Sequence, residues 1–281
     1  MVYTPNKTSD HDSAFLAPEV ADLLDQTVKA KAVIAQSSKL HSTSRPSVDF
    51  TLFTTPVGTG FIGELDDLPL SNADTGSVNV PAYKVAGATQ VSSETLDDMD
   101  PDIATMIGTS LADQTIHSLD SAFFAASTTK GFAGLLGQTY QSQDTGAASF
   151  TQDDIIKAVY KVNGAGGLGA PKADTLILPV ASAEALSLTK VGTGYNTYAL
   201  PLIFDGSPLE GLKVIVSDLV DADTFAWVLD STKNRLVLRK GTQITRTYVP
   251  QNDSWFISSV SRYGWDSLQD NAIVRVWNAT P

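Results

Sequence analysis

The sequence predicts an α+β fold in which a long helix supports a late run of antiparallel strands. Three observations lead to this prediction. Two strand-like segments enclose a long polar connection, a later stretch of about 24 residues has helical spacing, and the second half alternates short helices with strands. At 281 residues the chain has room for one large domain or two smaller ones.

The composition fits a protein with a buried core and excludes several kinds of chemistry. Hydrophobic residues make up 42% of the chain and charged residues 18%. There is no cysteine, which excludes disulfides, thiolate zinc sites and cysteine nucleophiles. No apolar run approaches the roughly 18–20 residues of a membrane span, and Met1–Leu16 lacks the basic and apolar parts of a signal peptide. We therefore expect a soluble protein that is made in the cytoplasm.

The net charge of −12 is unevenly distributed along the chain. Residues 1–150 carry 18 acidic and 7 basic side chains, whereas residues 151–281 carry 13 and 12. A dedicated nucleic-acid-binding protein needs a basic surface that neutralises phosphates. Acidic side chains outnumber basic ones in this chain, which argues against tight, direct binding of DNA.

The first strand-like segments indicate a hairpin. Apolar and polar residues alternate in 48–52 and again in 78–82, as they do in half-buried strands. Between them lies Thr54–Gly76, a segment rich in Gly, Pro, Asn and Asp. This pattern predicts a protruding β-hairpin with a long functional loop. Because an isolated two-stranded hairpin is marginally stable, we expect it to lie on another surface.

Two helices are predicted in the first half. One runs from Pro18 to about Lys39 and is followed by a turn or linker at 41–46. Asp100 and Pro101 form a helix start, with Asp as the N-cap and Pro at the first helical position. The apolar spacing that follows, interrupted at Thr115, extends to Phe123 and predicts a helix about 36 Å long. A helix of this length with one apolar stripe is suited to support a sheet.

The second half is predicted to alternate between helices and strands. Thr151 caps a helix that reaches Val162 and stops at Gly164. A further helix is expected near Ala181–Leu188. The predicted strands are 175–178, 212–217, 224–229, 235–240, 242–248, 255–262 and 273–277.

No pattern of residues predicts an active site. Gly164–Gly169 matches GxGxxG, but a helix precedes it and a strand follows it, which is the wrong order for dinucleotide binding. The acidic clusters 64–67 and 97–102 lack the spacing of a Ca²⁺ loop or of a catalytic carboxylate pair. The histidines, which are His11, His41 and His117, are isolated from one another. We expect no catalytic residue, no metal site and no cofactor, and therefore no enzyme activity.

Four segments resemble major capsid proteins of tailed bacteriophages. They are GELDDLPLSNADTGSVNVPAYKVAGATQVSSETLDD (63–98), DSAFFAA (120–126), SPLEGLKVIVSD (207–218) and RYGWDSLQDNAIVRV (262–276). The residues that match the pattern of this family are Glu64, Pro69, Ser71, Lys84, Ser93, Leu96, Asp97 and Asp98. The resemblance runs in order over about residues 16–277 and implies the Hong Kong 97 capsid fold.

The resemblance also implies a division of the chain and a set of partners. The expected parts are an N-terminal arm (1–45), an extended β-hairpin loop (46–90), a peripheral domain with the long spine helix (91–130 and 233–281) and an axial domain (131–232). The implied function is a subunit that self-assembles, as pentamers and hexamers, into the icosahedral head shell around double-stranded DNA. The implied partners are further copies of the chain, a separate scaffold protein and a portal, with a decoration protein as a further candidate. Packaged DNA would be contacted weakly and nonspecifically, and no membrane is expected to take part.

Two departures from the family matter. Some members form a covalent cross-link through a lysine of the extended loop, but Phe50–Tyr83 contains no lysine, so this bond is not expected here. Some members carry a long N-terminal scaffolding segment. Only about 15 residues precede the first predicted helix, so the scaffold is expected to be a separate protein.

Three alternatives remain at this point. An encapsulin-type bacterial nanocompartment shell resembles the same fold and would enclose a cargo enzyme. A nucleotide-using enzyme would use the glycine-rich loop, and a β-rich adhesion or tail module would form trimers or tubes. Particle size and contents, nucleotide binding and oligomeric form distinguish these classes.

The charge pattern suggests an intersubunit contact. Between Phe50 and Tyr83 the charged residues are Glu64, Asp66, Asp67 and Asp74. Between Thr232 and Tyr248 they are Lys233, Arg235, Arg239, Lys240 and Arg246. The resemblance implies that the extended loop lies across the peripheral domain of a neighbouring subunit, where these basic strands are expected. We therefore hypothesise that the acidic loop docks on the basic strands of an adjacent subunit, with Arg235, Arg239 and Lys240 as the contacting cations. The alternative is that Arg235 and Arg239 face solvent or packaged DNA.

Overall fold

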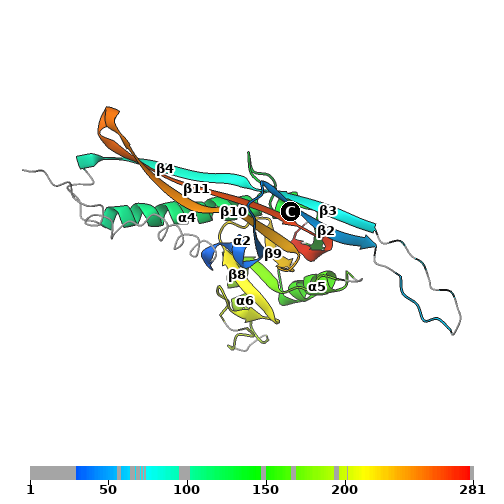
Figure 1. Cartoon of the computed structure of the whole chain (residues 1–281). Helices are drawn as coiled ribbons and strands as arrows, with labels where there is room; N and C mark the ends of the chain where they lie inside the picture. Colours follow the sequence, from blue (N-terminus) through cyan, green and yellow to red (C-terminus); the bar gives the residue numbers. More distant parts are fainter. Residues whose placement is uncertain are drawn as a thin grey trace, which may run out of the picture.

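The computed structural model describes residues 30–278 apart from 56–57, 64–66, 68–69, 71, 73, 95–101, 147–149, 166–168, 193–195 and 201. Within this part the chain forms a body with two sheets, from one end of which a two-stranded hairpin projects (Figure 1). None of the helices in the described residues combines the length and apolarity that a membrane crossing needs.

The first sheet has four strands in the order β1-β10-β11-β4. These strands are β1 (Lys39–Ser42), β10 (Asn234–Val249), β11 (Ser254–Ser267) and β4 (Tyr83–Ser92). The pair β1–β10 is parallel, and the pairs β10–β11 and β11–β4 are antiparallel. The helix α4 (Asp102–Phe124) runs along this sheet (Figure 1). The predicted late run of antiparallel strands is therefore confirmed for β10 and β11.

The long helix has the length that the sequence predicts. It spans 23 residues, and its apolar stripe ends in the fully buried Leu119 and Phe123. Phe123 packs edge-on against Trp265 of β11, with ring centroids 5.0 Å apart. Thr115 does not interrupt the buried stripe as predicted, because it is itself buried and its hydroxyl donates to the carbonyl of Leu111 at 2.8 Å. The expected cap at Asp100 and Pro101 lies outside the described residues.

The second sheet has six strands in the order β5-β12-β9-β6-β8-β7. They are β5 (Gln141–Asp144), β12 (Ile273–Trp277), β9 (Thr224–Leu229), β6 (Thr175–Pro179), β8 (Leu212–Ser217) and β7 (Pro208–Leu209). Both of its faces are buried. Ile177 and Trp227 belong to the core that α4 and the four-stranded sheet share, whereas Leu176 and Val228 pack with α5 (Gln152–Asn163) and α6 (Val180–Ser187).

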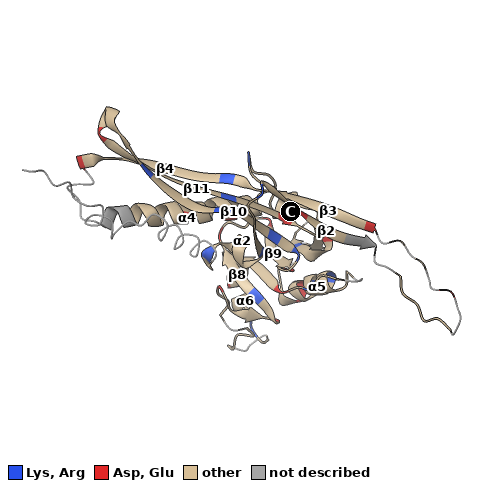
Figure 2. Cartoon of the chain, in the orientation of Figure 1, with Lys and Arg blue, Asp and Glu red and all other residues tan. Residues whose placement is uncertain are grey.

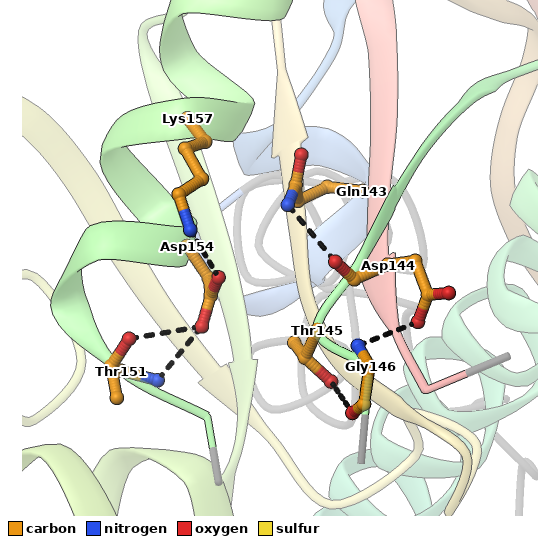
Figure 3. Close-up of polar contacts among 7 residues, drawn as sticks. All are labelled: Gln143, Asp144, Thr145, Gly146, Thr151, Asp154 and Lys157. Atoms are coloured by element: carbon orange, nitrogen blue, oxygen red, sulfur yellow. Dashed lines mark hydrogen bonds and ion pairs between the residues drawn. The ribbon is translucent and has the colours of Figure 1, made fainter. Parts of the chain in front are cut away.

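The start of α5 is fixed by its own side chains, as the sequence predicts. The backbone N–H and the hydroxyl of Thr151 both donate to the Asp154 carboxylate, at 3.2 and 2.9 Å, and Lys157 pairs with the same group (Figure 3). Gly164 ends the helix, which confirms the predicted stop. Beside this cap, the Asp144 carboxylate accepts a hydrogen bond from the Gly146 N–H and closes the turn after β5 (Figure 3).

Several boundaries differ from the predictions. The first helix was expected to reach Lys39, but its described part ends with α2 (Val33–Gln36), and β1 occupies residues that were predicted to be helix and turn. Pairing with β10 overrides the local pattern there, since each residue of β1 has a partner in β10. The start of this helix, at 18–29, lies outside the described residues.

Other strands also differ from the expected pattern. The predicted strands 235–240 and 242–248 form one long strand, β10, whose alternation breaks at register shifts on either side of Lys240. The short strands β5 and β7 were not predicted, because β5 is polar throughout and β7 has two residues. The described part of the chain also contains the short 3₁₀ helices η2 (Leu135–Gly137), η3 (Pro250–Asn252) and η4 (Asp270–Ala272).

A buried carboxylate joins α2 to the long helix. The Oδ2 and Oδ1 atoms of Asp120 accept hydrogen bonds from the backbone N–H groups of Val33 and Ile34, at 3.1 and 3.0 Å. Burial raises the pKa of Asp120 to about 6, although these N–H groups and His117 lower it. The carboxylate thus satisfies two backbone donors in the core, where an unpaired donor costs about 1–3 kcal/mol.

Asp120 should give the unassembled subunit a specific pH dependence. Its folded pKa of about 6 lies above its ordinary value of 3.8. The folded state therefore binds a proton more readily, and the stabilisation present below pH 3.8 is lost as the pH rises through about 6. The unfolding free energy of the wild type minus that of Asp120→Asn should fall by up to about 3 kcal/mol over this range.

Urea denaturation of both proteins between pH 4 and 7 measures this difference. Subtracting the two curves cancels the other titrating groups, which the proteins share. Parallel curves would show that Asp120 does not have a raised pKa.

Candidate intersubunit surface

The projecting hairpin confirms the protruding element that the sequence predicts. It consists of β2 (Ser47–Thr55) and β3 (Asp74–Pro81), which pair antiparallel from Ser47↔Pro81 to Thr55↔Asp74. Because β3 ends at Pro81 and β4 begins at Tyr83, the chain continues almost in line from the hairpin into the four-stranded sheet (Figure 1). The far end of the hairpin therefore points away from the body.

One side of the hairpin is apolar, and the connection beyond it exposes further apolar residues. Val48 faces Val80, and Phe50 faces Val78, so these four side chains share one side. Val80 is fully buried, whereas the other three are half-buried. In the connection beyond the strands, Phe61 and Leu70 are almost completely exposed. The subunit alone thus leaves uncovered an apolar surface that water disfavours.

The root of the hairpin is held by specific contacts. Phe50 packs edge-on against His41 of β1 at 5.2 Å between ring centroids, and the Arg235 guanidinium lies 5.6 Å from the centre of the Phe50 ring. At the same root, β11 passes very close to the chain. A Cβ atom on Gly264 would lie 2.1 Å from the carbonyl oxygen of Pro81, so only glycine fits there.

Gly264→Ala should therefore loosen the root of the hairpin. Moving Pro81 away to accommodate a methyl group should destabilise the unassembled subunit by about 1–3 kcal/mol in urea denaturation. Gly108→Ala in α4 is the matched control, because a methyl group on Gly108 would meet no atom within 4 Å. The control should be neutral or more stable, since alanine is the better helix former. Equal stability of the two variants would contradict the close approach.

The face of the four-stranded sheet that points away from α4 carries a row of cations. Lys84 of β4 pairs with Arg262 of β11, and Arg262 pairs with Lys240 of β10. Their neighbours Val85 and Tyr263 point to the opposite face, into the core. We call Lys84, Arg262 and Lys240 the cation row. Figure 2 shows basic positions in the middle of this sheet and an acidic position at the far end of β3.

The residues of the predicted contact do not all lie free on the surface. Asp67 and Asp74 are exposed, and Lys240 is exposed. The Arg235 guanidinium contacts Phe50 of its own chain, and the Nε of Arg239 donates to the Ser44 carbonyl at 3.4 Å. The other two predicted acids, Glu64 and Asp66, lie outside the described residues.

Two cations of the row, Lys84 and Arg262, were not predicted from the sequence to be contact residues, although Lys84 matches the pattern of the resembled family. Lys84 and Arg262 are far apart in the chain and single in their neighbourhoods, so no local charge run marks them. The signal that could have found them is the strand alternation itself. It places both on the polar side of their strands, and only the pairing of β4 with β11 brings them together.

The far end of the same sheet is tied by a polar network. The Asp253 carboxylate accepts hydrogen bonds from the Tyr248 and Ser93 hydroxyls, both at 2.8 Å, which joins the β10–β11 turn to the end of β4. The hydrogen bond from Tyr248 and then that from Ser93 lower the pKa of Asp253, while the bond to Asp253 raises the pKa of Tyr248. The Arg246 guanidinium lies over the Trp255 ring, 4.1 Å from its centre.

Neither metal-ligating side chains nor the glycine-rich segment form a recognisable site within the described residues. In the part of the chain that the structure describes, no three His, Cys, Asp or Glu side chains gather where they could hold a metal ion. The glycine-rich segment follows α5 and precedes β6, so its context is helix, loop, strand, the reverse of a dinucleotide-binding turn. Its Gly166 and Gly167 lie outside the described residues. A long helix under a sheet, a second sheet and a projecting hairpin are instead the parts that the resemblance to shell-forming capsid subunits implies.

Comparison with known proteins agrees with this class. The phage capsid family model matches residues 13–276. The capsid of an empty GTA particle with C5 symmetry has a TM-score of 0.74 at 18% identity, covering 89% of this chain and 90% of that chain. A structure from Gordonia phage Cozz gives 0.70 at 16%, covering 89% and 87%, and one from Mycobacterium phage Bobi gives 0.69 at 16%, covering 89% and 91%. No curated protein sequence matches the chain.

The chain belongs to the phage capsid family, whose members are the structural proteins of phage shells. Its fold is the Hong Kong 97 type that the sequence resemblance implied. These findings favour a phage capsid over the nanocompartment shell, and the two remaining alternatives, a nucleotide enzyme and an adhesion module, receive no support from the match.

Proposed function

We propose that this capsid protein assembles, as pentamers and hexamers, into the closed icosahedral head shell of a tailed phage around its double-stranded DNA. The observation that carries the proposal is the hairpin, which projects from the body with Phe61 and Leu70 exposed. A hairpin of two strands is marginally stable alone, so its apolar side needs the surface of another subunit. The family membership supports the same function.

The proposed division of labour within the subunit keeps four parts. They are the N-terminal arm (1–45), the extended loop (46–90), the peripheral domain (91–130 and 233–281) and the axial domain (131–232). The proposed peripheral domain corresponds to the four-stranded sheet with α4, and the proposed axial domain corresponds to the six-stranded sheet. Three strands cross this division. β12 (Ile273–Trp277) pairs with β9 and β5 in the six-stranded sheet, whereas β1 and β4, from the arm and the extended loop, belong to the four-stranded sheet.

The proposed partners follow from a purely structural role without catalysis. A separate scaffold protein would set the size of the shell, a portal would occupy one vertex, and a decoration protein would bind the outside. Assembly would take place in the cytoplasm of the host bacterium, and the finished protein would reside in the virion. The acidic loop, with Glu64, Asp66, Asp67 and Asp74, would contact basic strands of the adjacent subunit in the shell.

Electron microscopy of the purified protein, alone and with its scaffold, tests the proposal. Wild-type protein should form closed particles, or pentamers and hexamers that close when the scaffold is added. A variant in which residues 56–73 are replaced by a two-residue Asn-Gly turn should remain folded but fail to close, because the uncovered end of the hairpin is removed.

The far-UV circular dichroism of the shortened variant controls for folding. Its spectrum should match that of the wild type, because the removed connection lies beyond the paired strands β2 and β3. A wild-type protein that stays monomeric under every scaffold condition would contradict the proposed function. Closed shells from the shortened variant would show that the hairpin is not what joins the subunits.

A further inference from the structure

The cation row places three positive charges side by side on one face of the sheet. Adjacent strands lie about 4.8 Å apart, so Lys84 and Lys240 are each one strand away from Arg262. Like charges directly opposite each other destabilise a sheet. At these separations the repulsion is only partly screened, because the Debye length is about 8 Å at physiological ionic strength.

The subunit itself does not neutralise the row. None of the three side chains has an ion pair or hydrogen bond with a described residue. Arg262 is half-buried, and its Nε is enclosed without a hydrogen-bond partner among the described residues. Three unpaired like charges cost stability in the isolated subunit, which indicates that an anionic group from outside neutralises the row.

The surface around the row has the form of a docking site for a strand pair. Beyond the row, the same face presents Ala86 opposite Val260, Ala88 opposite Ser258, and then the exposed Phe256 opposite Gln90. This strip offers an apolar contact at its end. The strip is open because the chain's own hairpin root covers the opposite end of the face, at His41 and Arg235.

The chain supplies a matching partner in its own hairpin. Asp67 and Asp74 are exposed at the outer part of the hairpin, next to the exposed apolar residues Phe61 and Leu70. The charges between Phe50 and Tyr83 are all negative. The hairpin projects away from its own cation row, on the other side of the root (Figure 1), so it meets such a row only on a second copy.

We infer that the cation row Lys84–Arg262–Lys240 is the docking site for the acidic hairpin of a second copy of this chain, rather than a site that includes Arg235 and Arg239. The inference rests on the proposed function and names the receiving surface of its subunit contact. Hairpin and row are different patches of one chain, so the contact is head-to-tail, and it closes into a ring where the rotation between neighbouring copies allows it.

Neutralising two cations should have opposite effects on the subunit and on the assembly. Lys84→Gln/Lys240→Gln removes like-charge repulsion, so the thermal midpoint of the unassembled subunit should rise by about 2 °C. The same variant should need about tenfold more protein to assemble, measured by light scattering and electron microscopy. A residue pair with a merely structural role would lower both stabilities.

Lys172→Gln/Lys190→Gln is the matched control. These two lysines are exposed and lie outside the four-stranded sheet, and the variant has the same net charge as the test variant. The control should assemble at the wild-type concentration. If the two variants assemble alike while the wild type forms shells, the inference is wrong and the proposed function stands.

A charge exchange provides a second test that does not depend on one variant folding well. Asp67→Lys/Asp74→Lys should abolish assembly, and adding Lys84→Glu/Lys240→Glu in the same chain should restore at least part of it. Restoration supports a direct contact between hairpin and row, and its absence overturns the inference. Wild-type rings or open chains that depend on the row but never close would support the contact and contradict the closed shell.

Nucleic acid is the competing occupant of a cationic surface. If the row contacted DNA, Lys84→Gln/Lys240→Gln would lose binding to a double-stranded DNA fragment in a gel shift and would assemble like the control. That combination overturns the inference, because the row would then bind DNA phosphates rather than the hairpin. Unchanged DNA binding with impaired assembly supports it.

Discussion

The packing of α4 against the four-stranded sheet is the interaction on which the rest of the subunit depends. Leu119 and Phe123 are fully buried, and each contributes about 1.5–3 kcal/mol by leaving water. Phe123 meets Trp265 of the four-stranded sheet, and the same core includes Trp227 of the six-stranded sheet. The helix thereby covers one face of the four-stranded sheet, and the face that carries the cation row points away from it.

The hairpin root and the cation row depend on different physical interactions. The hairpin root uses close backbone approach at Gly264 and aromatic contact at Phe50, both of which fix a direction. The cation row uses charge, which acts at longer range and depends on salt. A projecting element with a fixed root and a charged receiving face suits a contact that forms many times with the same geometry.

Sequence reasoning predicted the elements whose pattern is local. The hairpin, the long helix and the cap of α5 each leave a periodic or capping signal in adjacent residues. β1 was missed because its strand state comes from pairing with β10, which lies in the last fifth of the chain. The contact of the acidic loop with basic strands stays a prediction. Its cations could not be chosen from sequence, since a run of charges does not show that Arg235 stacks on Phe50 or that Lys84 stands beside Arg262.

The position of β12 has a consequence for the order of synthesis and folding. It occupies the interior of the six-stranded sheet, between β5 and β9, although residues 273–277 leave the ribosome after every other strand of that sheet. During translation β5 and β9 therefore lack the strand that separates them, and the sheet stays incomplete until the closing residues arrive. Long-range pairing of this kind is slow compared with local pairing. A nascent chain therefore cannot complete its fold before its last residues are synthesised. Synthesis is thus separated in time from the joining of copies into larger particles.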